Sequence, residues 1–464
     1  MKIHEVYYHS PIVVQNILCS LYGLKLYFER YSGKFKKYQG YLDKTQYLSA
    51  DEIHAIQVKA FRQLLLNSIK GVPYYKKQFS ELDMASIKNM DSLSMLSILP
   101  KKQVRESPHL FLSSNKQKLV KINTSGTTGS PLSIYVSSEA RKKNYAFFDR
   151  SKKWAGLKGN EKSITFGGRV ILSSRQTLPP FWRSNFFNKN VLFSSYHISE
   201  NTLSYYIEAI RKIQPVYIDS YPSSIYQIAK YLITNNINDI KLKAIITSAE
   251  TLLEHQRNLI EQAFKCKVYD QYGGAEQVVF ACQCEEGALH VNPEYGYLEV
   301  VDENDQPLEK GELGEFVCTG FINDAMPLIR YKVGDMGILS DEKCPCGRNF
   351  PVIKKMVGRN DDVLITPQGK YIGRLDPIFK GMENTIVETQ IVQEKVDLIK
   401  INIVRGSGYK DFHGQYIINE LKKRMGEGVE FVVQYMDEIP KTKAGKFRAV
   451  VCNIKNNRKA VGWR

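Results

Sequence analysis

The chain has 464 residues, of which 43% are hydrophobic and 24% are charged. This length is too great for one compact core, so we expect a large domain and at least one smaller one, and the composition is ordinary for a globular protein. The net charge of +17 favours acidic partners, which include nucleotide phosphates, a coenzyme, nucleic acid and an anionic membrane surface. Eight cysteines in a chain of this kind do not indicate a disulfide framework.

The first predicted helix lies near the N-terminus. Residues 1–10 are polar and lack the charged-then-apolar pattern of a secretion signal, so we expect a cytoplasmic protein. Residues 11–28 are more apolar, but Gln15, Asn16 and Lys25 make the segment too short and too polar to span a bilayer. It predicts an amphipathic helix packed on the protein, with peripheral membrane association as the alternative.

A second helix is predicted at residues 50–69, where apolar residues recur at helical spacing and Gly71-Val72-Pro73 ends the pattern. The segment Thr124–Ser130 then places five hydroxyl side chains and two glycines before Pro131. Glycine lets backbone N–H groups approach an oxyanion and the hydroxyls add donors, so the segment predicts a phosphate-binding loop, although no lysine follows as in a P-loop. A flexible Ser/Thr/Gly surface loop is the alternative.

Residues 216–276 give the clearest architecture. Strands are predicted at 216–219, 243–247 and 267–270, with helices at 225–232 and 251–264, the second opening on a capping box at Thr251–Glu254. Strands that alternate with helices pair in parallel, so the turns after them share one edge of the sheet, where ligands of open α/β sheets bind. Those turns are Tyr221, Ser248 to Glu250, and Tyr272 to Glu276.

The pattern changes twice more towards the C-terminus. Short alternating strands with polar turns predict a β-rich subdomain at about 289–357. After 358–362 the chain starts again, with strands near 398–404 and 430–435 and a helix between them. We therefore predict an α/β protein with a large N-terminal domain at 1–360, built on a parallel doubly wound sheet, and a small C-terminal α/β domain at 361–464.

Two Cys-x-Cys pairs, Cys282/Cys284 and Cys344/Cys346, flank the β-rich segment. Together with His290, the sulfurs of Cys284, Cys344 and Cys346 make three thiolates and one imidazole, the ligand set of a closed structural zinc site. Cys282 competes with Cys284 for that role, and reduced, partly buried thiols are the alternative.

Five stretches in this order resemble the adenylate-forming superfamily of acyl-CoA synthetases and adenylation domains. They are Thr124–Leu132, Tyr272–Glu276, Arg330–Asp335, Gly358–Asp362 and Pro440–Arg448. Within the superfamily the chain most resembles the phenylacetate-CoA ligase family, particularly the branch associated with capsular polysaccharide genes. Further matching stretches are Pro73-Tyr74-Tyr75, Gly167-Gly168-Arg169, Tyr221-Pro222-Ser223 and Cys344–Arg348, so the resemblance covers the chain from about residue 60.

The resemblance implies that a carboxylate attacks the α-phosphate of ATP, after which CoA or an amine displaces AMP. Glu276 would ligate Mg²⁺ and Lys446 would bridge the substrate carboxylate and the α-phosphate. Asp335 would bind the ribose hydroxyls, Arg359 the ribose or phosphate, and Tyr272 the adenine. The remaining implied nucleotide-binding residues are Thr124, Ser125, Gly126, Thr127, Thr128, Gly129, Ser248, Ala249, Glu250 and Gly273.

Asp361 matches the family's hinge between the two domains, and an ordinary interdomain loop is its alternative. Gly168, Arg169, His197 and Tyr221 are candidates for the acyl pocket, with a core or surface histidine the plainer interpretation of His197. The implied cofactors are ATP, Mg²⁺ and CoA, with a possible structural Zn²⁺.

The expected partners are a carboxylic acid and an acceptor. CoA is the first expectation for the acceptor, and an amine on a surface polysaccharide is the alternative. A nucleotide-binding or RNA-binding scaffold without activity is the non-enzyme alternative, but no Arg-rich run or aromatic-basic repeat favours nucleic acid.

Overall fold

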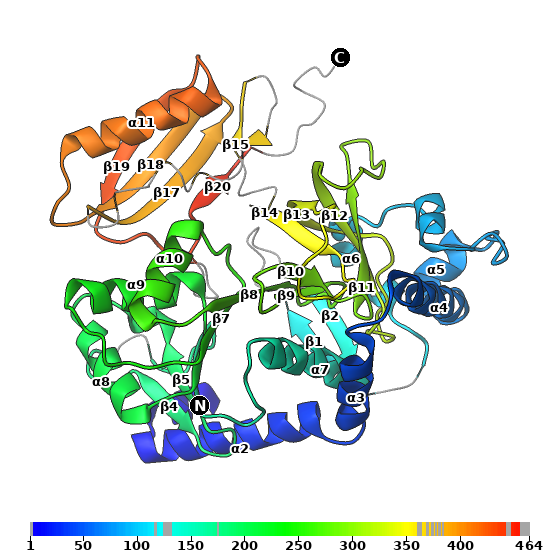
Figure 1. The fold of residues 1–464 in the computed structure, drawn as a ribbon, viewed down its shortest axis with the longest axis horizontal. Helices are drawn as coiled ribbons and strands as arrows, with labels where there is room; N and C mark the ends of the chain where they lie inside the picture. Colours follow the sequence, from blue (N-terminus) through cyan, green and yellow to red (C-terminus); the bar gives the residue numbers. More distant parts are fainter. Residues whose placement is uncertain are drawn as a thin grey trace.

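The computed structural model describes residues 3–115, 118–123, 132–173, 176–359, 364–367, 385–441 and 447–454, together with 371, 372, 375, 378 and 382. These residues form a large α/β body and a smaller C-terminal α/β layer, which Figure 1 shows beyond α9 and α10. The α/β class predicted from the sequence is therefore confirmed. The domain boundary at residue 360 stays a prediction, since 360–363 lie outside the described residues.

One twelve-stranded sheet runs through the large body in the order β11-β12-β13-β14-β10-β9-β8-β7-β6-β3-β5-β4. Its strands are β3 (Ser163–Gly167), β4 (Trp182–Asn185), β5 (Asn190–Ser194), β6 (Tyr217–Ser220), β7 (Ala244–Ser248), β8 (Val268–Gly273), β9 (Phe280–Gln283), β10 (Leu289–Val291), β11 (Gly296–Val301), β12 (Leu313–Gly320), β13 (Tyr331–Leu339) and β14 (Val352–Arg359).

The half of the sheet from β5 to β8 is parallel, as the strand–helix alternation predicts. Helices α8 (Leu203–Ile213), α9 (Pro222–Thr234) and α10 (Glu254–Phe264) pack on it around a core that includes Ile218, Ile228, Ile245 and Ile260. The predicted helix start at Thr251 is wrong. Helix α10 begins at Glu254 with Leu253 as its N-cap residue, because Leu252 packs against this core in an extended segment.

The β-rich part is not a separate layer but continues the same sheet. Strand β8 extends to Gly273 and pairs antiparallel with β9, with Tyr272 opposite Ala281. The expectation that Tyr272 lies in a turn is therefore wrong, because pairing with a strand outside the predicted α/β unit carries β8 three residues past Asp270. This strand links the parallel half to β9–β14.

The N-terminal elements pack on the antiparallel half and along the edge of the parallel half. They are α1 (Ile3–His9), α2 (Ile12–Tyr31), α3 (Phe35–Thr45), α4 (Ala50–Gly71), α5 (Pro73–Gln78), α6 (Lys101–Glu106), the hairpin β1 (Leu119–Asn123) and β2 (Ser133–Ser137), and α7 (Ser138–Trp154). Helix α4 opens on a capping box between Ser49 and Glu52. No helix among the described residues is long and apolar enough to cross a membrane, and the cytoplasmic location stays a prediction.

The C-terminal layer is a four-stranded sheet in the order β19-β18-β17-β20. Its elements are β17 (Ile386–Lys395), β18 (Leu398–Arg405), α11 (Asp411–Met425), β19 (Glu430–Met436) and β20 (Val450–Cys452), and the short strands β15 (Leu364–Ile365) and β16 (Tyr371–Ile372) precede them. The core between α11 and the sheet contains Ile399, Ile401, Ile417 and Leu421. The two strands predicted here both form, and β17 is an additional one.

Candidate active site

The turns after β6 and β7 meet at one edge of the sheet. The carboxylate of Glu250, two residues past β7 within the turn, accepts hydrogen bonds from the Ser223 N–H at 3.0 Å and the Ser223 hydroxyl at 3.1 Å. Burial raises the pKa of Glu250 above its usual value, and the donors on Ser223 oppose that shift. Ala249, just before it, has a φ of +71°, which is rare for a residue with a Cβ and marks a tight turn.

The C-terminal segment reaches this same edge. The Phe447 N–H donates to Glu250 Oε1 at 2.9 Å, across the interface between the two α/β layers. Lys441 Nζ lies 3.5 Å from the Ser195 carbonyl, so two residues that flank 442–446 contact the large body. Lys446 itself lies outside the described residues.

Tyr272 and Asp335 form a second contact at the site. The Tyr272 hydroxyl donates to Asp335 Oδ2 at 2.8 Å, joining β8 to β13. Burial, followed by the charge of Asp335, raises the pKa of Tyr272 well above its usual value, so this hydroxyl stays a donor. Asp335 pairs with Arg359 in the β13–β14 register. The structure thus brings together Tyr272 and Asp335, which the resemblance assigns to adenosine, and places the backbone of Arg359 beside Asp335.

Glu276 is buried near these residues and carries its own cation. Lys101 Nζ, at the start of α6, lies 2.9 Å from Glu276 Oε1, and the Tyr331 hydroxyl lies 3.3 Å from the same oxygen. A Cβ on Gly274 would lie 2.6 Å from Glu276 Oε2, so the glycine leaves room for the carboxylate. The site therefore holds a buried carboxylate whose negative charge is balanced by one lysine.

The structure describes some of the other predicted nucleotide-binding residues. Ser248 ends β7, and Gly273 ends β8 and is exposed. Asn123 and Ser133 pair as the last and first residues of β1 and β2, on either side of the predicted phosphate-binding loop. Thr124, Ser125, Gly126, Thr127, Thr128, Gly129 and the hinge residue Asp361 lie outside the described residues.

Two of the four acyl-pocket candidates, Gly168 and Tyr221, are in contact, since a hydrogen bond with the Gly168 backbone opposes the rise in the pKa of the Tyr221 hydroxyl. The Gly168 carbonyl accepts from the Tyr196 hydroxyl at 3.1 Å, and the exposed Arg169 lies 6.0 Å from the Tyr22 ring on α2. Tyr221 is the N-cap residue of α9, and burial with the nearby Glu250 charge raises the pKa of its hydroxyl to about 12.

His197 is held by its neighbours. Its Nδ1 lies 2.7 Å from the Ser194 hydroxyl, its Nε2 lies 3.2 Å from the Ser173 carbonyl, and its ring stacks on Phe181. Because burial lowers the pKa of His197, the ring is neutral near pH 7, with Nε2 the protonated nitrogen that donates to the carbonyl. These contacts support the plainer interpretation of a packed histidine.

A second cluster lies where β9 and β10 meet the loop between β13 and β14. The ligand atoms of Cys284, His290, Cys344 and Cys346 all lie within 4.8 Å of one another. The Cys284 and Cys344 sulfurs are 3.7 Å apart, and Cys346 Sγ is 3.3 Å from His290 Nε2. His290 Nδ1 faces the Phe350 carbonyl at 3.2 Å, which leaves Nε2 directed to the sulfurs. The donors fit a tetrahedral zinc ion.

Cys282 does not join this cluster. Its buried sulfur accepts a hydrogen bond from the Asn292 side-chain amide at 3.6 Å, on the opposite side of β9 from Gln283. The geometry therefore favours Cys284 over Cys282 as a ligand.

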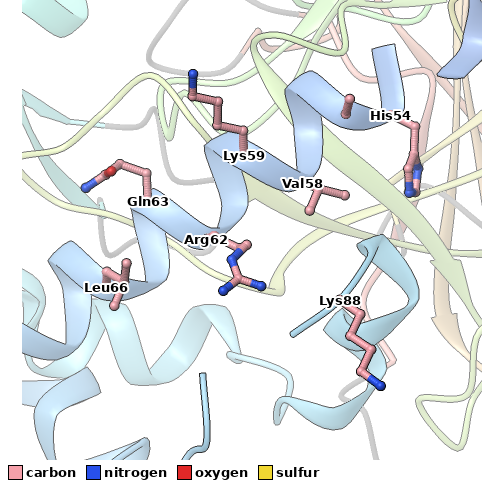
Figure 2. Close-up of a pocket in the computed structure, with 8 residues that line it drawn as sticks. His54, Val58, Lys59, Arg62, Gln63, Leu66 and Lys88 are labelled. Atoms are coloured by element: carbon pink, nitrogen blue, oxygen red, sulfur yellow. The ribbon is translucent and has the colours of Figure 1, made fainter. Parts of the chain in front are cut away.

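A surface pocket of about 580 Å³ lies away from both clusters, on α4 (Figure 2). Figure 2 shows its lining side chains along the helix, with Lys88 on a separate segment. The residues that line it are His54, Ala55, Val58, Lys59, Arg62, Gln63, Leu66 and Lys88. None of the residues predicted for the site lines this pocket.

Two contacts at the site have no signal in the sequence. Lys101 precedes Glu276 by 175 positions, and Phe447 follows Glu250 by 197. Lys101 stands in no pattern that marks it, since it is one lysine in a strongly basic chain. Phe447 lies in the Pro440–Arg448 stretch, but it makes its contact through its backbone N–H, which no side-chain pattern predicts.

The chain is similar to one described protein family and to several known proteins. Residues 364–453 match the family described as the CapK C-terminal domain. Protein CapK of Staphylococcus aureus is 29% identical over 459 residues, which cover 98% of this chain and all of that protein. A phenylacetate-coenzyme A ligase of Thermus thermophilus is 21% identical over 445 residues, 89% of this chain and 99% of that one.

Solved structures agree on the fold. The 2-hydroxyisobutyryl-CoA ligase in its postadenylation state, in complex with an acyl-AMP, aligns with a TM-score of 0.67 at 16% identity. The alignment covers 90% of this chain and 93% of that one. The relatives that carry an activity in their names, and the solved neighbour, are adenylate-forming acid–thiol ligases.

Proposed function

We propose that this chain, a homologue of CapK and of the phenylacetate-CoA ligases, is an ATP-dependent ligase that activates a carboxylic acid as its acyl adenylate. The acyl group then passes to an acceptor thiol, for which CoA is the first candidate. The acid itself is left open, because no contact among the described residues selects an aromatic, fatty or hydroxy acid.

The observation that carries this proposal is the hydrogen bond between the Phe447 N–H and Glu250. Phe447 directly follows Lys446, and Glu250 lies in the turn after β7, at the edge where Tyr272 and Asp335 also meet. The backbone of Phe447 therefore contacts the edge that carries the adenosine candidates. This arrangement is what a reaction that joins a carboxylate to a nucleotide phosphate requires.

In the first step, a carboxylate oxygen of the acid bonds to the α-phosphorus of ATP, the bond to the bridging oxygen of the β-phosphate breaks, and pyrophosphate leaves. Both reactants are anions, so catalysis consists mainly of alignment and charge neutralisation. Lys446 would supply a positive charge between the carboxylate and the α-phosphate. Asp335 and Tyr272 would orient the ribose and the base, with the Tyr272 hydroxyl fixing the Asp335 carboxylate.

Mg²⁺ fits Glu276, because a hard cation prefers carboxylate and phosphate oxygens and Glu276 is a buried carboxylate at this edge. When bound, the ion would neutralise the negative charge that accumulates on the departing pyrophosphate. Lys101 balances the same carboxylate at 2.9 Å, so it would compensate the charge before the ion and nucleotide enter.

In the second step, the acceptor attacks the acyl carbon and AMP leaves. A thiolate of CoA gives an acyl-CoA thioester, whereas an amine of a surface polysaccharide gives an amide. The likeness to phenylacetate-CoA ligases supports CoA, and the amine stays the alternative.

We also propose that Cys284, His290, Cys344 and Cys346 hold a structural zinc ion, supported by the mutual approach of their ligand atoms. Because all four positions carry protein ligands, the ion would have no open position for a substrate. Its role would be to fasten the loop between β13 and β14 to β9 and β10.

Exchange of labelled pyrophosphate into ATP, measured across a panel of carboxylic acids, tests the proposal. We expect exchange with at least one acid in the wild type. Lys446→Ala should lose on the order of 3 kcal/mol or more of transition-state stabilisation, a drop of roughly a hundredfold, while it keeps most of its nucleotide binding. Lys443→Ala, in the same segment, is the matched control and should exchange normally.

No exchange with any acid, in protein that is folded and binds ATP, would favour a nucleotide-binding scaffold instead. Full exchange by Lys446→Ala would remove this lysine from its role. The acceptor is tested separately, by comparing CoA-dependent with amine-dependent AMP release for the acid that supports exchange.

A further inference from the structure

Helix α2 packs with its polar side inward. Its buried residues are Gln15, Ser20, Gly23 and Leu26, of which only the last is a large apolar residue. Gln15 Oε1 accepts from the buried Arg183 guanidinium at 2.6 Å, and Asn16 Oδ1 accepts from the Ser184 N–H at 2.9 Å. The helix is therefore held on β4 by hydrogen bonds rather than by an apolar stripe.

The contact with β4 and the turn after it continues from Gln15 to Gly23. The Ser20 hydroxyl accepts from the Phe186 N–H at 3.1 Å, and the Gly23 carbonyl accepts from the Asn188 side chain at 3.3 Å. A Cβ on Gly23 would lie 2.3 Å from Asn185 Nδ2, so the Asn185 side chain would have to move if a larger residue stood there. Rotation of α2 to bury its other side would break all of these contacts.

The outward side of α2 is apolar. Val13 is 69% exposed and Leu21 is 53% exposed, and the turn after β4 adds Phe186 at 65%. Further exposed large apolar residues of α2 and of that turn are Ile12, Val14, Ile17, Leu18, Tyr22, Tyr27, Phe28 and Phe187. We call the exposed apolar residues of α2 together with Phe186 and Phe187 the α2 surface. Figure 1 shows α2 along one edge of the molecule, below β4, β5 and α7.

The charge around the α2 surface has one sign. The sequence contains no Asp or Glu from residue 6 to 28 or from 162 to 199, the segments that form the surface and its surroundings. Lys25, Arg169 and Lys189 are exposed there. Glu29, the acid on α2, is bound by Arg141 at 2.7 Å. An apolar surface with aromatic side chains and a rim of cations, of which Lys25 lies 4.0 Å from Glu29, matches the interface of an anionic bilayer.

We propose that the α2 surface docks this protein on an anionic membrane, with α2 lying in the plane of the interface. A second copy of the chain is a poorer occupant, because a two-fold contact on this surface would bring Lys25, Arg169 and Lys189 of both copies together. This inference stands on the outward side of α2 and does not rest on the proposed ligase activity.

The docked surface adjoins the loop that follows β3. The Tyr7 hydroxyl donates to the Ile171 carbonyl at 3.0 Å, the Tyr8 hydroxyl donates to the Val170 carbonyl at 3.4 Å, and Arg169 lies over the Tyr22 ring. This loop carries Gly168 and Arg169, two of the acyl-pocket candidates. If they line that pocket, its substrate would be an acid or an acceptor located at the membrane interface.

Flotation with liposomes tests the docking. The wild type should float with vesicles of 30% phosphatidylglycerol in phosphatidylcholine and remain largely unbound with pure phosphatidylcholine. The triple variant Val13→Ser, Leu21→Ser and Phe186→Ser should bind the anionic vesicles at least tenfold more weakly. The matched control, Met95→Ser with Phe412→Ser, removes two exposed apolar residues outside the α2 surface and should bind like the wild type.

Circular dichroism and the melting temperature verify that the variants fold, as is expected for exposed positions. Lys25→Glu with Lys189→Glu should also weaken binding tenfold or more at low salt. Equal flotation of the wild type and the triple variant would overturn the proposal. The proposal would also be overturned if the wild type is a dimer in solution that does not bind vesicles, while the triple variant is a monomer. Binding that is the same on neutral and anionic vesicles would overturn the part assigned to charge.

Discussion

Glu276 and Lys101 form an ion pair, and we expect replacement of Glu276 to lower activity and replacement of Lys101 to lower stability. Glu276→Gln removes the proposed Mg²⁺ ligand and leaves a lysine whose side chain is 28% exposed and can reach water. We expect pyrophosphate exchange to fall about a hundredfold or more, with little change in melting temperature. Lys101→Met leaves a buried carboxylate without its cation and should lower the free energy of unfolding by roughly 1–3 kcal/mol.

Exchange kinetics and thermal melts of both variants check this prediction. If Glu276→Gln retains wild-type exchange at every Mg²⁺ concentration, Glu276 does not hold the ion. If both variants lose only stability, the pair is structural.

Asp270 provides a pH-dependent test of how β8 is stabilised. Burial raises the pKa of this carboxyl from 3.8 to about 6, against the hydrogen bond that it accepts from the Thr247 hydroxyl at 2.6 Å. Between those pH values the folded state keeps a proton that the unfolded state has lost, so this group's contribution to stability falls as the pH rises. The whole effect is roughly 2–3 kcal/mol.

Asp270→Asn should remove this contribution while it keeps an acceptor for Thr247. The difference between the melting temperatures of the variant and the wild type should therefore change with pH. It should favour the variant more at pH 7 than at pH 4. Parallel profiles for the two proteins across that range would contradict the assignment.

At the scale of residues, the sequence was most informative where a motif stands on one strand or turn. Tyr272, Glu276 and Asp335 stand in short motifs, and their mutual approach follows once the order of the strands is known. The partners Lys101 and Phe447 could not be predicted, because they come from elements whose position depends on packing across about two hundred residues.

At the scale of elements, the proposed zinc site lies where the β9–β10 hairpin meets the loop between β13 and β14. We expect about one zinc ion per chain by elemental analysis, released on Cys284→Ser and retained in the matched control Cys282→Ser. Removal of the metal should lower the melting temperature, since Cys344 and Cys346 lie in the long loop that joins β13 to β14. Because Asp335 and Arg359 lie on these two strands, nucleotide binding should weaken as well.

Two results would contradict the zinc prediction. The first is wild-type protein that is purified without chelators, contains no zinc and takes up none. This result would favour three reduced thiols and one imidazole that hold no metal. Loss of the metal from Cys282→Ser, with retention in Cys284→Ser, would reverse the ligand assignment.

The elements themselves show where sequence patterns stop being sufficient. The parallel strands β6, β7 and β8 follow from apolar runs that alternate with helices. The length of β8 does not, because residues 271–273 are held by β9 rather than by their own propensity. The sequence also does not predict which side of α2 faces the protein. Apolar residues at helical spacing predict that the apolar side is buried. In the structure, hydrogen bonds to β4 and the turn after it hold the polar side inward instead.

At the scale of the whole molecule, polar contacts between described residues hold the C-terminal layer on the large body in the arrangement seen here. Gln227 on α9 donates to Glu388 Oε1 at 2.9 Å, Lys230 Nζ lies 3.3 Å from the Ile386 carbonyl, and Phe447 donates to Glu250. These contacts between described residues are polar, as is common at interfaces between domains of one chain. The resemblance to adenylate-forming enzymes implies that the C-terminal domain rotates between the two steps, and each of these contacts would break in that rotation.

Glu250 should therefore contribute to the two half-reactions unequally. In this arrangement its carboxylate holds the backbone next to Lys446, and loss of a hydrogen bond to a charged group costs about 1.5–3 kcal/mol. Glu250→Ala should slow adenylation, measured by pyrophosphate exchange, on the order of tenfold or more. It should leave the release of AMP from a presynthesised acyl adenylate by CoA within about twofold, because the proposed rotation has already broken the contact by that step.

Ser223→Ala distinguishes the contact of Glu250 with Phe447 from its contact with Ser223 at the start of α9. The substitution removes the 3.1 Å hydroxyl contact to Glu250 but keeps the backbone N–H of Ser223 and the contact to Phe447. We expect it to behave like the wild type in both half-reactions. If Ser223→Ala slows adenylation as much as Glu250→Ala, the effect arises from the turn after β6. If Glu250→Ala slows both half-reactions equally, Glu250 stabilises the nucleotide site as a whole, and the Phe447 contact does not distinguish one domain arrangement from the other.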